Sequence, residues 1–227
     1  MPATAPTRYR ITFAKTESMR FTGHLDLHRT WERTFRRAGL PLAYSEGFNP
    51  HPRLNIGAAL PLGCLSRGDL IDAWLERRMD PAEVEQALRR AAPPGIEVES
   101  VKPADAGEPV LQSRIRTARF EASSPSFPDA ATMNRSIEEL MALDHLLRER
   151  RGKSYDLRQR IERLEYDADR SRLMMWLSAC EGAFGRPEEV LDALGLNVPD
   201  CVATRVELVL AEAVPSEVEG SSQQIPS

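Results

Sequence analysis

Cysteine is scarce in this 227-residue sequence, and long apolar runs are missing. The three cysteines, Cys64, Cys180 and Cys201, lie far apart and form no CxxC pair, which excludes zinc knuckles and iron–sulfur sites built from neighbouring ligands. So few cysteines are typical of the reducing cytoplasm. No apolar run approaches the roughly 18 to 20 residues of a membrane span, and the N-terminus lacks a secretory pattern. The sequence predicts a cytoplasmic protein without a membrane segment.

An overall positive charge is also missing, because the formal net charge is -4. This argues against a protein that coats nucleic acid with its whole surface, although a local basic patch is still possible. The content of 41% hydrophobic and 28% charged residues is ordinary for a globular protein. At this length, two domains of about 100 residues each are expected.

The first half of the chain alternates between strand and helix patterns. Strands are expected where apolar and polar residues alternate, and helices where apolar residues recur every three or four positions. These patterns predict strands at 8–15, 54–60, 70–76 and 96–101, a helix capped by Thr22 that ends before Gly39, and a helix over 80–91. The order is strand, helix, strand, strand, helix, strand, which is the ferredoxin-like pattern.

The second half repeats this order more faintly. The patterns predict strands at 115–122, 173–177 and 206–210, helices at 131–143 and from Gly185, and a helical turn leading into a strand within 156–166. We therefore predict an α+β fold of two tandem ferredoxin-like (βαββαβ) units with antiparallel sheets, at 8–102 and 114–212. A linker joins them, and 213–227 is expected to be a disordered tail because it contains too few apolar residues.

Three of the four histidines, His24, His28 and His51, lie between Met19 and Gly63. Together with Cys64 or Glu46 they could bind a metal ion, and this alternative stays open. However, the glutamate of an HExxH motif is missing between the two helical histidines, so we predict neither a metal site nor a cofactor. No catalytic signature is complete, so the catalytic residues are unknown.

The segment EGFNPHPR is unusually constrained for a loop. Two prolines fix its backbone and one glycine permits a positive φ, so the loop is expected to be rigid. The side chain of Asn49 can bond to the neighbouring backbone, and the loop would present Tyr44, Phe48, His51 and Arg53 at low entropic cost. The alternative is a stiff connection between two sheet elements with no binding role.

Basic residues cluster in two stretches, against the average of the chain. From Arg8 to Arg53, nine Lys/Arg face four Asp/Glu, and from Arg148 to Arg163, seven face three. Such segregation is typical of a phosphate-binding surface, although charged helix faces are often simply solvated. The predicted binding residues are His24, Arg29, Arg33, Arg36, Arg37, Phe48, Asn49, His51, Arg53, Arg158 and Arg160.

Four motifs together resemble a known family. The runs GHLDL, EGFNPHP, KSYDLRQRIERLEY and GRPEEVLDALGL are similar to the radical-SAM-linked family of uncharacterised bacterial proteins, also called DUF2344. The resemblance extends from about Arg8 to Glu212. It implies a partner, a B12-binding-type radical SAM protein encoded beside or fused to the domain. This chain has no CxxxCxxC motif, so the resemblance implies an accessory domain rather than the cluster-bearing enzyme.

These features lead to one hypothesis and two alternatives. The hypothesis is an accessory protein, a non-catalytic domain rather than a stand-alone enzyme, that binds RNA as the substrate of a radical SAM partner. The first alternative is a metal-independent endoribonuclease or other RNA-processing enzyme with His24 or His51 as general acid or base. The second is a protein–protein adaptor without nucleic-acid binding.

Overall fold

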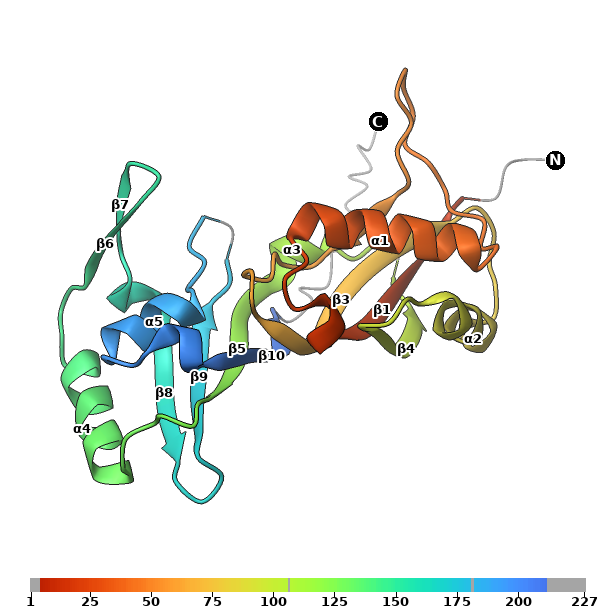
Figure 1. Cartoon of the computed structure of the whole chain (residues 1–227). Helices are drawn as coiled ribbons and strands as arrows, with labels where there is room; N and C mark the ends of the chain where they lie inside the picture. Colours follow the sequence, from red (N-terminus) through yellow and green to blue (C-terminus); the bar gives the residue numbers. More distant parts are fainter. Residues whose placement is uncertain (1–4, 106, 181, 212–227) are drawn as a thin grey trace, which may run out of the picture.

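The structure, a computed structural model, describes residues 5–105, 107–180 and 182–211 (Figure 1). The elements of the first half are β1 (Thr7–Lys15), α1 (His24–Arg37), β2 (Leu54–Ile56), β3 (Leu65–Leu75), α2 (Pro81–Ala91) and β4 (Ile96–Pro103). Those of the second half are α3 (Leu111–Arg114), β5 (Ile115–Ser123), α4 (Ala130–Met141), β6 (Leu147–Arg150), β7 (Lys153–Asp156), β8 (Ile161–Asp167), β9 (Arg172–Ser178), α5 (Pro187–Ala193) and β10 (Val202–Leu210). Within these ranges, no helix is long and apolar enough to cross a membrane.

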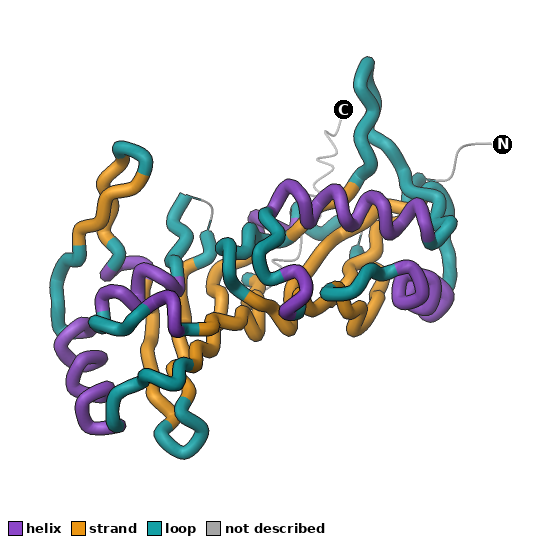
Figure 2. The backbone as a smooth tube through the Cα atoms, in the orientation of Figure 1, coloured by secondary structure: helices purple, strands orange, loops and turns teal. Residues whose placement is uncertain are grey.

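One sheet runs through the whole molecule, as the continuous band of strands in Figure 2 shows. Its order is β4-β1-β3-β10-β5-β9-β8, and the short β2 also pairs with β3. All of these pairs are antiparallel except β3 with β10, which is parallel and joins Leu65 to Thr204 and Ser66 to Arg205. A separate hairpin of β6 and β7 lies outside this sheet. The α+β class with a mostly antiparallel sheet is therefore confirmed.

A buried cluster in the first half fixes the position of α1. Leu27, Trp31 and Phe35 recur at helical spacing on α1, and all three are buried against the sheet. The Trp31 ring meets the ring of Phe13 edge to face, with 4.9 Å between centroids. Val84 of α2 enters the same cluster. Because this side of α1 is buried, the opposite side must face solvent.

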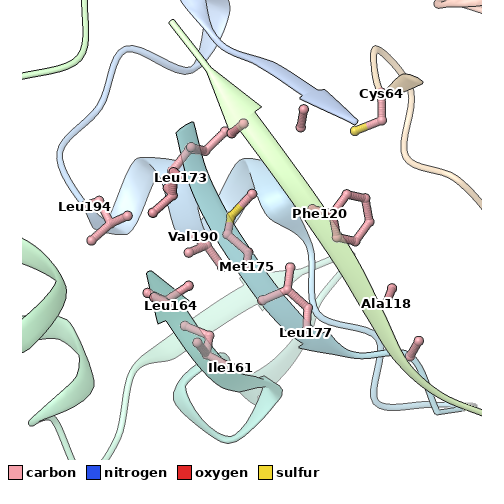
Figure 3. Close-up of a cluster of buried hydrophobic side chains, with 14 of the residues drawn as sticks. Cys64, Ala118, Phe120, Ile161, Leu164, Leu173, Met175, Leu177, Val190 and Leu194 are labelled. Carbon is pink, nitrogen blue, oxygen red and sulfur yellow. The ribbon is translucent and has the colours of Figure 1, made fainter. Parts of the chain in front are cut away.

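A second buried cluster fills the other half of the molecule. Figure 3 shows Phe120 of β5 and Met175 of β9 within it. Cys64, from the loop before β3, lies at the edge of this cluster although it belongs to the first half of the chain. The two clusters therefore follow the two halves of the sheet, except near the β3–β10 junction. The predicted boundaries at 8–102 and 114–212 stay a prediction, and the tail at 213–227 lies outside the described residues.

Several boundaries differ from those predicted. The N-cap of α1 is Gly23 and not Thr22, and β2 ends at Ile56 instead of Leu60. The β6–β7 hairpin was not predicted, since its LRER and KSYD segments contain almost no apolar residue that could alternate. The helical turn over 158–160 that leads into β8 is confirmed.

Candidate nucleic-acid interface

Exposed arginines occupy the solvent side of α1. Arg29, Arg33, Arg36 and Arg37 are all exposed, on a helix whose other side is buried. We call these four the arginine face. Arg29 donates to Asp26 at 3.3 Å, whereas the other three have no ion-pair partner within the described part of the chain. The arginine face is therefore a row of cations whose charge is largely uncompensated.

The other basic residues of the first stretch do not contribute to that surface. Arg8 and Arg10 both pair with the buried carboxylate of Asp72. Lys15 is buried, and the guanidinium of Arg20 donates to the carbonyl of Gly63 at 2.9 Å. Four of the nine basic residues counted in the sequence are thus structural, which leaves the arginine face and Arg53.

A protruding arm, residues 43–53, follows α1 (Figure 1). Its two sides are joined by backbone hydrogen bonds from Ser45 to His51 at 2.8 Å and from Arg53 to Ala43 at 2.8 Å. Gly47 adopts a φ of 121°, which few residues other than glycine can adopt. Phe48, near the tip, is wholly exposed, with a relative accessibility of 106%. The arm therefore presents an aromatic ring to solvent on a hydrogen-bonded support.

Asn49 and His51 are exposed on the same arm, but Arg53 points elsewhere. The Arg53 guanidinium lies over the ring of Trp74, 4.9 Å from its centroid. Trp74 alternates along β3 with Ala73 and Leu75, which are buried beneath α1. Arg53 is therefore on the sheet face opposite α1, and the structure separates it from the arginine face.

The two histidines of α1 have different surroundings. His28 Nδ1 lies 3.0 Å from Oε1 of Glu32, and its Nε2 lies 3.4 Å from the carbonyl oxygen of Leu54. His24 is exposed at the start of the helix. Although the residue as a whole is exposed, partial burial of its imidazole lowers the pKa of His24, and His28 and Arg205 shift it in the same direction. Among the described residues, no three His, Cys, Asp or Glu side chains are grouped so as to hold a metal ion.

Arg158 and Arg160 lie in the second half, before β8, which is an edge strand of the sheet. Arg158 donates to the carbonyls of Met141 and Ile161, at 3.2 and 3.0 Å. Arg160 donates to the carbonyl of Phe184 at 3.0 Å and stacks on Tyr155. Both guanidinium groups thus bond within the second half, and the structure does not bring them to α1.

A cleft of about 660 Å³ opens beside the N-terminus of α1. Four segments line it: the start of α1, the loop 57–62, the start of α3 and the loop after β9. Its polar lining groups include His24, Gln112, Cys180 and Arg186. Of these, only His24 was predicted as a site residue. The closest signals of the cleft in the sequence were two glycines that line it, Gly23 and Gly57. They lie in segments that were interpreted as a helix start and a strand.

Buried cations hold two walls of the cleft in place. Arg205 of β10 is fully buried and donates to Asp69 at 2.6 Å, to Ala58 at 2.9 Å and to Ala59 at 3.1 Å. Lys15 Nζ donates to the carbonyls of Arg20 and Thr22, at 3.1 and 3.3 Å. The first set fixes the loop 57–62, and the second fixes the segment that leads into α1. Strands of both halves therefore shape this cleft.

Comparison with known proteins gives a family and no activity. The family model described as "Uncharacterized protein conserved in bacteria (DUF2344)" matches residues 8–187. No curated protein matches the chain. One similar solved structure is described as an unknown protein from Galdieria sulphuraria. It is 11% identical, the match covers 92% of this chain and 99% of that one, and its TM-score of 0.28 is too low to support an argument.

Proposed function

The chain belongs to the DUF2344 family of uncharacterised bacterial proteins, and we propose that it is an accessory protein that binds RNA through the arginine face and the arm. The carrying observation is the row of exposed arginines on α1, of which Arg33, Arg36 and Arg37 have no acidic partner in the described chain. An α-helix rises about 1.5 Å per residue, so Arg29 and Arg36 stand about 10 Å apart along its axis. A row of that length can contact about two successive phosphates, and each contact releases counterions.

The arm supplies the second kind of contact. Phe48 takes no part in either buried cluster, and its ring is entirely available to a ligand. Stacking of a base on an aromatic ring contributes about 1–3 kcal/mol and tolerates any sequence. His51 and Asn49 stand beside it as hydrogen-bonding groups. Unpaired bases of single-stranded or looped RNA are the ligand that this arm fits best.

The reaction partner rests on the family resemblance alone. In this proposal, the B12-type radical SAM protein that the resemblance implies performs the chemistry. The present chain binds the RNA substrate of that enzyme. A cytoplasmic location follows from that assignment.

We also propose that each half is a ferredoxin-like unit. Each half contributes four strands to the main sheet. In chain order they are β1, β2, β3 and β4 in the first half and β5, β8, β9 and β10 in the second. The order across the sheet is then fourth, first, third, second in both halves. The same strand order, with a helix after the first and third strands, supports a repeated βαββαβ unit.

Fluorescence anisotropy of labelled single-stranded RNA in EDTA, over a salt series, tests the binding function. The double variant Arg33→Gln/Arg36→Gln should flatten the slope of log K against log salt by about 1.4, roughly 0.7 for each lost phosphate contact. The control is Arg170→Gln, an arginine that is also exposed but lies in the turn between β8 and β9, and it should leave the slope unchanged. Phe48→Ala should weaken binding by about 1–3 kcal/mol at every salt concentration without changing the slope, because stacking releases no counterions.

Three results would contradict this function. If the protein did not bind RNA even at low salt, the RNA-binding function would be rejected and the protein–protein adaptor would be the remaining hypothesis. Equal effects of Arg170→Gln and the double variant would show that binding does not involve α1. RNA fragments on a gel after the measurement, lost in His24→Ala or His51→Ala, would replace the accessory function with a metal-independent nuclease.

A further inference from the structure

The cleft beside α1 has the dimensions of a small-ligand site. Its volume of about 660 Å³ falls within the roughly 300–1,000 Å³ typical of such sites. Its walls come from both halves of the chain and are held by the hydrogen bonds of Arg205 and Lys15. Two of the four walls of the cleft are therefore fixed by buried groups.

The charge of the lining favours an anion. Among the described residues that line the cleft, two can carry a positive charge, Arg186 and His24, and none is Asp or Glu. Arg186 donates through Nη1 to Glu188 at 3.4 Å, longer than the roughly 2.7–2.9 Å of a tight charged pair, and its other donors have no partner among the described residues. The buried charge of Arg205 also acts on His24, whose pKa it lowers after burial and His28. Arg186 and His24 can therefore bind an anionic group in the cleft by charge-assisted hydrogen bonds.

The remaining lining is apolar. Ala59, Pro61, Ala179 and Phe184 are among the residues that enclose the cleft. Leu62 and Val110 line it as well, although they are 67% and 55% exposed. Large apolar side chains left in water beside a cleft are covered when a ligand with an apolar face binds. The lining thus suits a molecule that combines a flat apolar part with an anionic group.

Gly23 leaves room for such a ligand at the start of α1. Its φ of -73° is accessible to any residue, and a Cβ built there would meet nothing within 4 Å. Neither backbone strain nor crowding therefore requires glycine at this position. As N-cap, it offers no side-chain acceptor to the first amide groups of the helix, which remain available beside His24.

We propose that the cleft takes one nucleotide of the bound RNA, with the base against the apolar walls and its phosphate at Arg186 and His24. This inference rests on the proposed function. The arginine face begins with Arg29, about 7.5 Å along the helix axis from His24, so a strand held by α1 reaches the cleft at the helix start. The arginine face holds the backbone, and the cleft selects the nucleotide.

Thiol labelling reads out occupancy directly. Cys180 lines the cleft and is partly exposed, whereas Cys64 and Cys201 are only 5% and 7% exposed. We would measure the rate at which a fluorescent maleimide labels Cys180, with CMP, AMP, inorganic phosphate or single-stranded RNA present. CMP or AMP, and RNA, should slow the labelling, whereas inorganic phosphate should not, because it leaves the apolar walls uncovered.

Two variants distinguish nucleotide binding in the cleft from phosphate binding on α1. Arg186→Gln should weaken protection by the nucleotides about tenfold or more, as expected for the loss of a hydrogen bond to a charged group. Arg33→Gln, on the arginine face, should leave that protection unchanged while reducing the salt slope of RNA binding. In the unmodified protein, proton NMR of His24 should show its titration midpoint rise when CMP or AMP binds, because a nearby phosphate favours the imidazolium.

The outcomes distinguish this inference from the function on which it rests. If RNA binds but Cys180 labels at the same rate and His24 does not respond, the cleft proposal is overturned and the binding function survives. If RNA does not bind, the proposed function fails. Nucleotide protection would then overturn only the statement that the nucleotide belongs to bound RNA.

Discussion

Cys64 is a buried thiol at the junction of the two halves. Burial, with a contribution from the negative charge of Glu188, raises the pKa of this thiol to about 12 from an ordinary value of 9.0, although three nearby cations oppose the shift. In the unfolded chain the thiol ionises near its ordinary value. Over the window between these two values, the native state therefore keeps a proton that the unfolded state has lost.

The sign of the effect follows from this difference in protonation. Since the native state binds more protons between pH 9 and about 12, the free energy of unfolding should fall as pH rises through that window, by at most about 1.4 kcal/mol per pH unit from this group. Urea unfolding of the protein and of Cys64→Ala at several pH values measures the contribution. The variant should lose less stability above pH 9, whereas the two curves should run parallel between pH 7 and 8, where the thiol is neutral in both states. Parallel curves at every pH would refute the assignment.

Individual side chains were the hardest feature to place from sequence. Arg8 and Arg10 were counted as surface charge, but they pair with Asp72, more than 60 positions later. Lys15 was also counted as a surface charge, because nothing in the neighbouring sequence distinguishes it from an exposed lysine. It is buried only in the folded protein. Local charge counts cannot detect a partner that pairing of distant strands brings close. The arginine face, by contrast, follows from local spacing, because Leu27, Trp31 and Phe35 recur at helical intervals on the buried side and leave the four arginines on the solvent side.

The loop 57–62 and strand β10 are linked through one guanidinium. Arg205 is fully buried, with Asp69 as its charged partner and two backbone carbonyls of the loop as further acceptors. Removal of one member of a buried pair leaves the other charge unpaired, which typically costs about 3–5 kcal/mol. The loop also loses the donors that hold it against the sheet.

Arg205→Met should therefore destabilise the protein by about 3–5 kcal/mol and abolish the nucleotide protection of Cys180. The control is Glu207→Gln on the same strand. Glu207 pairs with Arg119 at 3.3 Å at the surface, where an ion pair contributes about 0–1 kcal/mol. Chemical denaturation of both variants measures the difference. Similar losses in the two variants would mean that Arg205 contributes no more than a surface charge.

Elements with strong periodicity were predicted well, and elements shaped by distant contacts were not. The amphipathic pattern of α1 and the Asp80 N-cap of α2, which accepts from Ala82 at 2.8 Å, are encoded locally. The early end of β2 is not, because Gly57 packs closely against Leu111 and Ile115 and Arg205 takes the next two carbonyls. The cleft was missed for the same reason, since four separated segments line it.

At the scale of the whole molecule, the parallel pairing of β3 and β10 makes the two halves share one sheet. Arg205 and Asp69 bond across this junction, and Leu60 and Cys64 of the first half pack into the cluster of the second. A single set of contacts thus contributes to the stability of both halves. Cooperative unfolding is the expected consequence.

Fluorotryptophan NMR during urea unfolding tests this expectation without substitutions. Trp31 and Trp74 report on the first half and Trp176 on the second. We expect one midpoint for all three fluorine signals. In the Arg205→Met variant the junction is weakened, so the signals of Trp31 and Trp74 should have a different unfolding midpoint from that of Trp176. Distinct midpoints in the unmodified protein would mean that the halves unfold independently.

The position of β10 also determines the order in which the molecule can be completed. It is the last described strand of the chain, yet it lies in the middle of the sheet, between β3 and β5. During translation both neighbours leave the ribosome before it, and their facing edges stay open until it arrives. Chains interrupted before Arg205 lack the donor that fixes the loop 57–62. Addition of β10 is therefore the step at which the loop 57–62 is first held in place and the cleft takes the shape described above.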